Sequence, residues 1–522
     1  MIPRSLVYAE RGAVATSQPL AASAGLWALG RGGTAVDAAL AAALVLTVVE
    51  PTSNGLGADA FALVLEEGVA YGYNGSGAAP LAADVEAVRA RSREGRVAER
   101  GWVPVTVPGA PAAWADLHAR FGKLPWDELF LPARRYARDG YPLAPRTAEQ
   151  WRRAAEIFRG EAFADWRALF LPPGFTPRAG ARWSSPDHER TLACLAREGV
   201  SAFYRGTLAE RLAEVARRGG GWLDENDLAA HEGLWVEPLT AVHDGWGLCT
   251  LPPNSQGLVL LETLLVLEAH RRRGGAAGDH ESIEAAKRAF ADALECLGDP
   301  ADAEEAVARM LDAPTHHEAL AATLSDPAAD YDPPEPYHGG TVYVAAADGE
   351  GRLVSYIQSN YMGFGSGVVV PGTGIALQNR GACFTLRPGR VNTWAPGRRP
   401  YHTLVPSLAV APDGTRIALG VVGGFFQPQG QLQILEHLRA WGLDALQEAL
   451  DAPRWSWRGG RRVSVEAGFD PKRAAGLEHR GHDVVCEPPG VTFGRAQAVA
   501  RRHNGTLLAA SDPRADGFAL GF

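Results

Sequence analysis

Two glycines followed by a threonine-led strand pattern constrain this chain more than any other feature. Gly339 and Gly340 end a proline-rich stretch, and Thr341 opens a run of β-branched and aromatic residues, Val342-Tyr343-Val344. A run of this kind, bounded by Gly and Pro, predicts a β-strand that starts at Thr341. On its own, the pattern is more typical of a turn into a strand than of a catalytic site.

A break in the chain before Thr341 would give this residue two reactive groups. Its hydroxyl is a nucleophile, and its freed α-amine has an unperturbed pKa of roughly 7.7–8.0, close to the optimum for a general base at neutral pH. A threonine activated by its own terminal amine is an established form of nucleophilic catalysis. The bond between Gly340 and Thr341 is therefore a candidate cleavage site.

The regions before and after this point differ in their predicted secondary structure. An Ala-rich segment that follows Thr34 and stops at Pro51 predicts a buried helix, and periodic apolar residues between positions 208 and 297 predict further helices. Strand and turn patterns dominate after Thr341. Together they predict one large α+β domain whose active site joins two segments. The predicted strands are 61–65, 342–346, 353–357, 368–370 and 417–422, and the last of them runs into Gly423-Gly424.

Composition and short motifs exclude several functional classes. The net charge of −9 argues against a nucleic-acid-binding surface, and the longest apolar run, residues 38–49, is too short to span a membrane. Five dispersed cysteines and an N-terminus without an apolar signal segment favour a reducing cytoplasm.

We expect no metal, because His316-His317 matches no metal-binding motif, and no organic cofactor. Gly55, Gly57 and Ala60 match a dinucleotide fingerprint, but the strand follows the loop instead of preceding it.

Short motifs spread along nearly the whole chain resemble the γ-glutamyltranspeptidase family of N-terminal nucleophile hydrolases. Each motif is weak alone, but their order and spacing together are specific. The motifs are residues 32–39 (GGTAVDAA), 50–57 (EPTSNGLG), 107–110 (VPGA), 121–125 (FGKLP), 203–206 (FYRG), 224–228 (DENDL) and 297–300 (LGDP).

The resemblance implies a fold and a maturation step. The expected fold is a four-layer αββα sandwich, in which two stacked β-sheets lie between helical layers. The expected maturation is self-cleavage between Gly340 and Thr341, which would give a large subunit, 1–340, and a small subunit, 341–522, intertwined in one structural domain. The resemblance leaves open a homodimer of such processed pairs. Glycine fits before the cleaved bond, because it leaves the carbonyl open to attack and tolerates strained backbone angles.

The resemblance also implies catalytic roles for four residues. Thr341 matches the nucleophile, and Gly423 and Gly424 match the pair whose backbone N–H groups form the oxyanion hole. Ser359 lies where the family places a threonine that hydrogen-bonds the nucleophile. Removal of one oxyanion-hole donor typically costs roughly 2.7–4 kcal/mol of transition-state stabilisation, so these glycines carry a large predicted share of catalysis.

The pocket that family members use for the glutamyl group is altered in this chain. Ser76 stands in place of the arginine that binds the α-carboxylate, and Cys383 in place of the aspartate that binds the α-amino group. His402 and Thr403 replace a pair of serines, and Tyr361 replaces an asparagine. A hydrogen bond to a charged group contributes about 1.5–3 kcal/mol, so the resemblance implies weakened γ-glutamyl recognition.

The altered motifs are similar to those of the oxamate amidohydrolase branch of the family. Such an enzyme handles a small amide that carries a carboxylate. Arg380 is the candidate to bind this carboxylate, because arginine pairs with carboxylates in a bidentate manner; a structural ion pair is the alternative. For His402 the alternatives are contact with the leaving group and a structural hydrogen bond.

We therefore predict a self-processing amidohydrolase that hydrolyses a small carboxylate-bearing amide through a Thr341 acyl-enzyme. A γ-glutamyl hydrolase or transpeptidase that acts on glutathione-type donors is the alternative within the family. An alternative of another class is an uncut homologue that only binds ligands, since the family often has an aspartate where this chain has Gly340.

Overall fold

The predicted strand at Thr341 forms the first half of a buried hairpin. The computed structural model describes residues 4–332 and 339–522, so most of the proline-rich stretch before Gly339 lies outside them. β10 (Gly340–Asp348) pairs antiparallel with β11 (Leu353–Tyr361), and Thr341 lies opposite Ser359. The predicted strands 342–346 and 353–357 are confirmed, and both are longer than the sequence pattern indicates.

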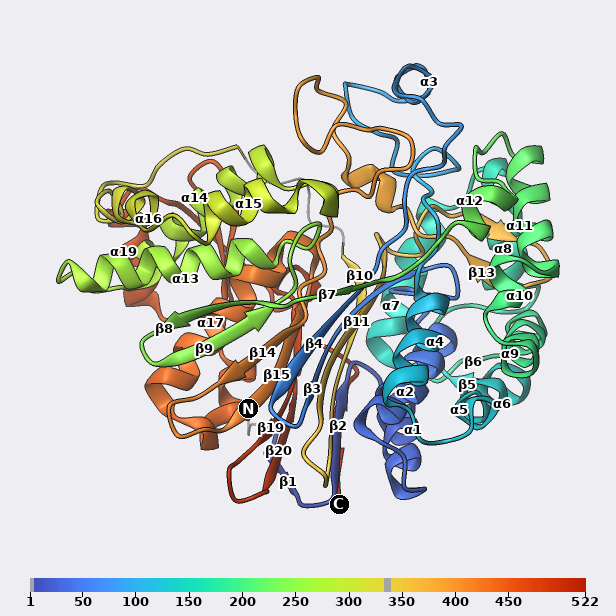
Figure 1. Cartoon of the computed structure of the whole chain (residues 1–522), viewed down its shortest axis with the longest axis horizontal. Coiled ribbons are helices and arrows are strands. Elements are labelled where there is room, and N and C mark those ends of the chain that lie inside the picture. Colours follow the sequence, from blue (N-terminus) through green and yellow to red (C-terminus); the bar gives the residue numbers. More distant parts are fainter. Residues whose placement is uncertain (1–3, 333–338) are drawn as a thin grey trace.

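Two antiparallel sheets are stacked face to face in the centre of the molecule (Figure 1). Within the described residues each sheet has seven strands, and the β10–β11 hairpin lies inside the second sheet, between β2 and β3. The first sheet runs β1 (Val7–Ala9), β20 (Leu507–Ser511), β19 (Arg495–Arg501), β15 (Arg416–Val422), β14 (Ser407–Val410), β9 (Trp246–Thr250) and β8 (Leu239–His243). The second runs β21 (Phe518–Gly521), β2 (Gly12–Thr16), β10, β11, β3 (Asp59–Glu66), β4 (Val69–Gly75) and β7 (Leu234–Val236).

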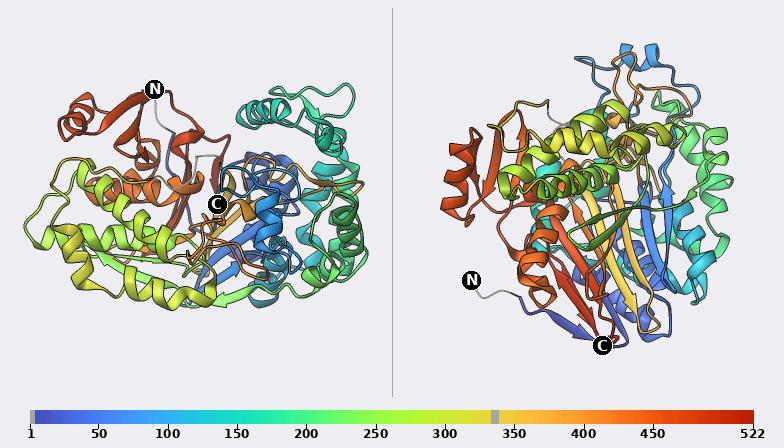
Figure 2. Two further views of the ribbon diagram at one scale, coloured as in Figure 1. Left: turned by 90° about the horizontal axis from the view of Figure 1, so that it is seen from above. Right: turned by 60° about the vertical axis from the view of Figure 1, so that its left-hand side comes forward.

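Helices cover the outer face of each sheet, as Figures 1 and 2 show. Those against the second sheet are α1 (Pro19–Gly30), α2 (Ala35–Val49) and α4 (Ala110–Phe121). Those against the first sheet are α13 (Gly257–Arg272), α17 (Gln427–Trp441) and α18 (Leu446–Asp451), and α14 (Asp279–Cys296) packs on α13. The expected αββα order of layers is confirmed.

The remaining elements lie around this sandwich. None of the helices in the described ranges is both long and apolar enough to cross a bilayer. The outer helices are α3 (Val85–Ala90), α5 (Trp126–Leu129), α6 (Leu131–Asp139), α7 (Pro145–Ile157), α8 (Ala164–Phe170), α9 (Pro186–Glu198), α10 (Ser201–Tyr204), α11 (Thr207–Arg218), α12 (Glu225–Ala229), α15 (Ala303–Met310), α16 (Pro314–Ala321) and α19 (Pro471–His479). The small sheets pair β5 (Tyr141–Pro142) with β6 (Arg182–Trp183), β12 (Val369–Val370) with β13 (Ile375–Ala376), and β16 (Trp455–Gly459) with β17 (Arg462–Glu466) and β18 (Asp483–Glu487).

The Ala-rich helix α2 begins and ends where its sequence indicates. Thr34 Oγ1 accepts a hydrogen bond from the Asp37 backbone at 3.2 Å, and Asp37 Oδ2 accepts one from the Thr34 backbone at 2.9 Å, which completes a capping box. Every residue of α2 is buried, because its small side chains let it lie close to the second sheet and to α1. Glu50, the residue after the last turn of the helix, is therefore also buried in the interior.

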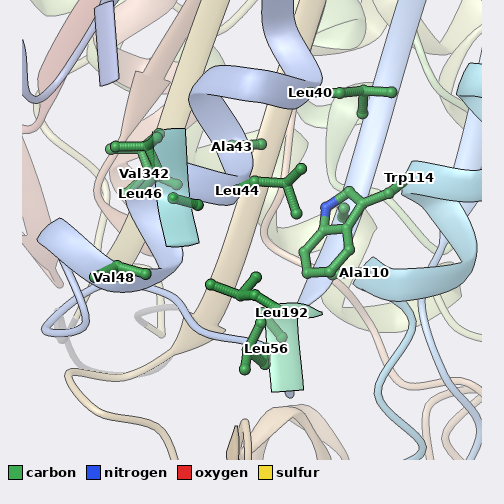
Figure 3. Packing of buried hydrophobic residues seen from close by; sticks show 14 of the residues in the cluster. Leu40, Ala43, Leu44, Leu46, Val48, Leu56, Ala110, Trp114, Leu192 and Val342 are labelled. Carbon is green, nitrogen blue, oxygen red and sulfur yellow. The ribbon is translucent and has the colours of Figure 1, made fainter. Parts of the chain in front are cut away.

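Side chains of β10 alternate between two hydrophobic cores. Val342 and Val344 belong to the core under α2, where Figure 3 shows Val342 beside Leu46. Tyr343 and Ala345 belong to the core between the two sheets. Because the side-chain period of a strand is two, Thr341 lies on the same face as Tyr343 and points toward the first sheet.

Candidate active site

Ser359 links the hydroxyl of Thr341 to the peptide group that precedes Thr341. Ser359 Oγ lies 3.0 Å from Thr341 Oγ1 and donates a hydrogen bond to the Gly340 carbonyl oxygen at 2.7 Å. The two hydroxyls lie within hydrogen-bond distance of each other, and Ser359 Oγ also accepts a hydrogen bond from the Tyr361 backbone N–H at 2.7 Å. A shift in strand register between Gly340 and Thr341 bends the chain at this bond. The predicted nucleophile and its predicted partner are thus in contact.

Gly423 and Gly424 lie directly beside the residue before the candidate bond. They follow β15 with positive φ angles of 144° and 61°, which favour glycine, and lead into α17. A Cβ atom on Gly339 would lie 3.0 Å from Gly423 Cα and 3.3 Å from the Gly424 nitrogen. The backbone of Gly339 therefore lies against the two glycines that are predicted to form the oxyanion hole.

Arg380 is a fully buried cation beside the same serine. Its guanidinium donates to Thr403 Oγ1 at 2.9 Å and to Ser359 Oγ at 3.2 Å, and its Cζ lies 4.5 Å from the centre of the Tyr361 ring. No carboxylate oxygen of the described residues lies within 4.0 Å of the guanidinium, and its Nε has no hydrogen-bond partner there. Arg380 thus lacks the carboxylate partner that a structural ion pair would supply.

Asp59 and His402 form a buried pair close enough to Arg380 to feel its charge, and the sequence pattern did not indicate this pair. His402 Nε2 is 3.1 Å from Asp59 Oδ2, and both side chains have no exposed surface. Burial raises the pKa of Asp59 to about 7, against the lowering effect of the Arg380 charge. Burial and the same charge hold the pKa of His402 well below its usual range, so the imidazole is neutral at physiological pH. The Nε2 atom of His402 is thus occupied by its contact with Asp59.

Ser76 is held in a separate network of amide side chains. Its hydroxyl donates to Asn74 Oδ1 at 2.7 Å and accepts from Asn254 Nδ2 at 3.2 Å. Asn254 also donates to the Pro400 carbonyl at 2.7 Å. The hydrogen bonds of Ser76 therefore support the loop before His402 and do not reach Thr341.

A cavity of about 470 Å³ borders the site next to Cys383. Cys383 Sγ lies 3.7 Å from a guanidinium nitrogen of Arg380, and Phe425, which also lines the cavity, directly follows Gly424. The cavity thus borders Cys383, which contacts Arg380, and Phe425, which follows the glycine pair. Its other lining residues are Glu94, Gly95, Arg96, Ala291, Leu294, Glu295, Leu297, Tyr331, Asp332, Phe384, Thr385, Arg387, Arg390, Asn392 and Tyr401.

Comparisons with known proteins find relatives over nearly the whole chain. The family model described as gamma-glutamyltranspeptidase matches residues 21–522. The chain belongs to the γ-glutamyltranspeptidase family. The chain is 36% identical to the oxamate amidohydrolase proenzyme of Klebsiella pneumoniae, over 96% of this chain and 97% of that protein. It is 34% identical to the glutathione hydrolase-like YwrD proenzyme of Bacillus subtilis, over 96% of this chain and 97% of that protein.

A solved structure of similar shape is the cephalosporin acylase from Bacillus halodurans. It superimposes with a TM-score of 0.92 at 42% identity and covers 99% of this chain and 97% of its own. The named relatives in the γ-glutamyltranspeptidase family are hydrolases, several of them proenzymes. This chain is therefore an enzyme of the hydrolase class, with the N-terminal nucleophile hydrolase fold.

Close packing around Gly340 leads to a prediction for this family member. A Cβ atom there would lie 2.9 Å from the Gly363 nitrogen and 3.0 Å from the Met362 carbonyl carbon, both backbone atoms. We expect Gly340→Ala to slow self-cleavage by about 100-fold, because a 1 Å misplacement of reacting groups has an effect of this order. A time course of fragment formation on a denaturing gel measures this rate. Gly30→Ala is the control, because a Cβ at Gly30 meets nothing within 4 Å; equal cleavage rates in both variants would contradict the prediction.

His316, which the sequence placed outside any metal motif, lies in a cluster of charged groups on the outer helices. Its Nε2 is 2.7 Å from Asp292 Oδ2 and 3.6 Å from Glu262 Oε1. The three ligand atoms lie within 4.8 Å of one another, a spacing that a metal ion can bridge. Arg309, however, forms an ion pair with the other oxygen of Asp292. This ion pair joins α15 to α14, whereas neither oxygen of the buried Glu262 of α13 has a hydrogen-bond partner within the described residues.

Proposed function

We propose that this protein is a self-processing amidohydrolase whose nucleophile is Thr341. One observation carries the proposal: Ser359 connects Thr341 Oγ1, at 3.0 Å, with the Gly340 carbonyl oxygen, at 2.7 Å. The nucleophile, a hydrogen-bond donor to the carbonyl and the bond to be cut are thus neighbours at one strand start. Gly423 and Gly424 lie beside Gly339, close to the bond to be cut, and we assign the oxyanion hole to their backbone N–H groups.

The proposed maturation converts one peptide bond into two chain ends. Thr341 Oγ1 attacks the Gly340 carbonyl carbon, the C–N bond breaks, and the hydroxyl proton moves to the departing nitrogen. The product is an ester between Gly340 and Thr341. Water hydrolyses this ester, which leaves a carboxylate on Gly340 and restores the hydroxyl beside a free α-amine. Ser359 stabilises the first step, since its hydrogen bond strengthens as negative charge develops on the Gly340 oxygen.

The proposed turnover uses the freed amine as its base. The amine takes the proton of the Thr341 hydroxyl, which attacks the substrate amide carbon, while the N–H groups of Gly423 and Gly424 stabilise the oxyanion. The proton then passes to the leaving nitrogen, and ammonia or an amine departs. Water attacks the acyl-enzyme ester and releases the acid. In these steps every proton is donated and accepted by the chain, the substrate or water. The proposed mechanism therefore needs no metal or organic cofactor.

Arg380 supports a small carboxylate-bearing amide as the substrate. The guanidinium and the nucleophile share Ser359 as a neighbour, at 3.2 and 3.0 Å. A carboxylate bound by Arg380 would therefore lie close to the attacked carbon. That spacing fits an oxamate-like acyl group, in which the carboxylate is bonded to the amide carbon. It fits a γ-glutamyl group less well, because three carbon atoms separate its two functional groups.

The proposed products are residues 1–340 and 341–522, and we place the enzyme in a reducing compartment. None of the five cysteines, all of which lie in the described ranges, forms a disulfide, and this supports a cytoplasmic location. The two products would remain together, because β10 and β11 of the small subunit lie between β2 and β3 of the large one.

Substrate preference tests the proposal directly. We expect ammonia release from oxamate to exceed dye release from a γ-glutamyl anilide by at least about tenfold in kcat/KM, because the lost glutamyl contacts are worth about 1.5–3 kcal/mol each. Intact mass should show two products cut at Gly340–Thr341. Faster turnover of the anilide would favour the γ-glutamyl alternative, and a wild-type chain that stays whole and inactive would favour the ligand-binding alternative.

A further inference from the structure

Arg495 connects the strand that carries the oxyanion glycines with the strand that carries Thr341. It is the first residue of β19, where it pairs with Val422, the residue before Gly423. Its side chain crosses from the first sheet to the second, and its guanidinium donates to the Thr341 carbonyl oxygen at 3.2 Å. One residue thus contacts both halves of the proposed catalytic site.

Glu50 fixes the direction of this guanidinium. Its Oε1 accepts from Arg495 at 3.0 Å and from Ser53 Oγ at 2.9 Å, and its Oε2 accepts from Ser17 Oγ at 2.5 Å. The side chains of Arg495 and Glu50 are 5% and 2% exposed. Because Glu50 follows the buried helix α2, the pair links that helix to both sheets at the position of Thr341.

We propose that Arg495, oriented by Glu50, is a positioning residue for the nucleophile. Cleavage before Thr341 turns this residue into a chain terminus, and chain termini are poorly ordered unless they are held. Ser359 holds the hydroxyl of Thr341, whereas Arg495 holds its backbone at a fixed offset from Gly423. This inference rests on the proposed function, since it requires Thr341 to be the nucleophile of a cut enzyme.

Arg495→Gln tests the role through the separation of kcat from KM. We expect kcat to fall about 30- to 100-fold, in line with the effect of a misplacement of about 1 Å, while KM changes less than about threefold. Arg495→Lys keeps the charge but not the two-pronged donor, and should recover part of the lost kcat. Glu50→Gln, which removes the charge and keeps one of the two acceptor oxygens, should also lower kcat without raising KM.

Arg288→Gln is the matched control for the loss of a buried ion pair. Arg288 donates to Glu284 Oε2 at 2.8 Å within α14, away from both central sheets. A purely structural role for Arg495 predicts similar losses of thermal stability and equal kcat in the two arginine variants. The proposal predicts a loss of kcat in the Arg495 variant alone.

The outcomes separate this proposal from the proposed function. A cut, folded Arg495→Gln enzyme with kcat within threefold of wild type would overturn the positioning role. If that variant does not fold, Arg495→Lys and Glu50→Gln decide, and wild-type kcat in both would overturn it. A wild-type protein that is uncut and inactive would instead overturn the proposed function.

Discussion

Replacement of Thr341 by alanine should leave a single uncut chain of 522 residues without amidase activity. The variant lacks the Thr341 hydroxyl that would attack the Gly340 carbonyl carbon. The bond therefore stays intact, and no free α-amine forms. We expect ammonia release to fall by at least about 10⁴-fold, as is typical when an enzyme loses its nucleophile. A denaturing gel with intact mass measures cleavage, and an ammonia assay measures turnover.

Thr341→Ser is the control for this experiment. Serine keeps the hydroxyl and the hydrogen bond to Ser359, so the chain should still be cut and should keep measurable activity. Two fragments in the alanine variant would show that another group or a protease breaks the chain. An active alanine variant would disprove the role of Thr341 as nucleophile.

Replacement of Arg380 by glutamine should abolish recognition of the substrate carboxylate. A bidentate pair contributes two hydrogen bonds of about 1.5–3 kcal/mol each, so kcat/KM for oxamate should fall about 10²- to 10⁴-fold. The reason is that the guanidinium of the buried Arg380 lacks a carboxylate partner among the described residues, and its Nε lacks a hydrogen-bond partner there. The measurement is ammonia release by the cut fraction of the variant, since Arg380 also contacts Ser359.

A neutral substrate distinguishes carboxylate binding from a general disturbance of the site. Oxamide has the size of oxamate but carries a second amide in place of the carboxylate. The Arg380→Gln variant should hydrolyse oxamide at close to the wild-type rate. Equal losses on both amides would assign Arg380 a structural role through Ser359 and Thr403.

Local features of the fold follow from the sequence because they depend on neighbouring residues. Thr34 and Asp37 form the capping box that starts α2, and Pro51 lies just beyond its end. The β-branched and aromatic run after Thr341 predicts β10, whose partner β11 is the next strand along the chain. The order of the family motifs along the chain predicted the αββα layers, which no single element indicates.

Contacts between distant residues could not be predicted in this way. His402 and Asp59 are 343 residues apart, and Arg495 and Thr341 are 154 apart. Periodicity shows which face of a strand is buried, but it does not show which side chain of another sheet will lie opposite. One signal was available for Asp59: a carboxylate at the start of an otherwise apolar strand requires a buried partner. Arg495 offered no comparable signal, because arginine at a strand end is ordinary on a surface.

In the proposed cut enzyme, the interleaved second sheet would make unfolding irreversible. Before cleavage, β2, β3 and the hairpin between them assemble within one molecule. After cleavage, the same sheet can reform only when two separate chains meet and thread their strands in alternate order. Heat should therefore inactivate the mature enzyme irreversibly, so that its lifetime is set by the height of the unfolding barrier and not by an equilibrium between folded and unfolded states.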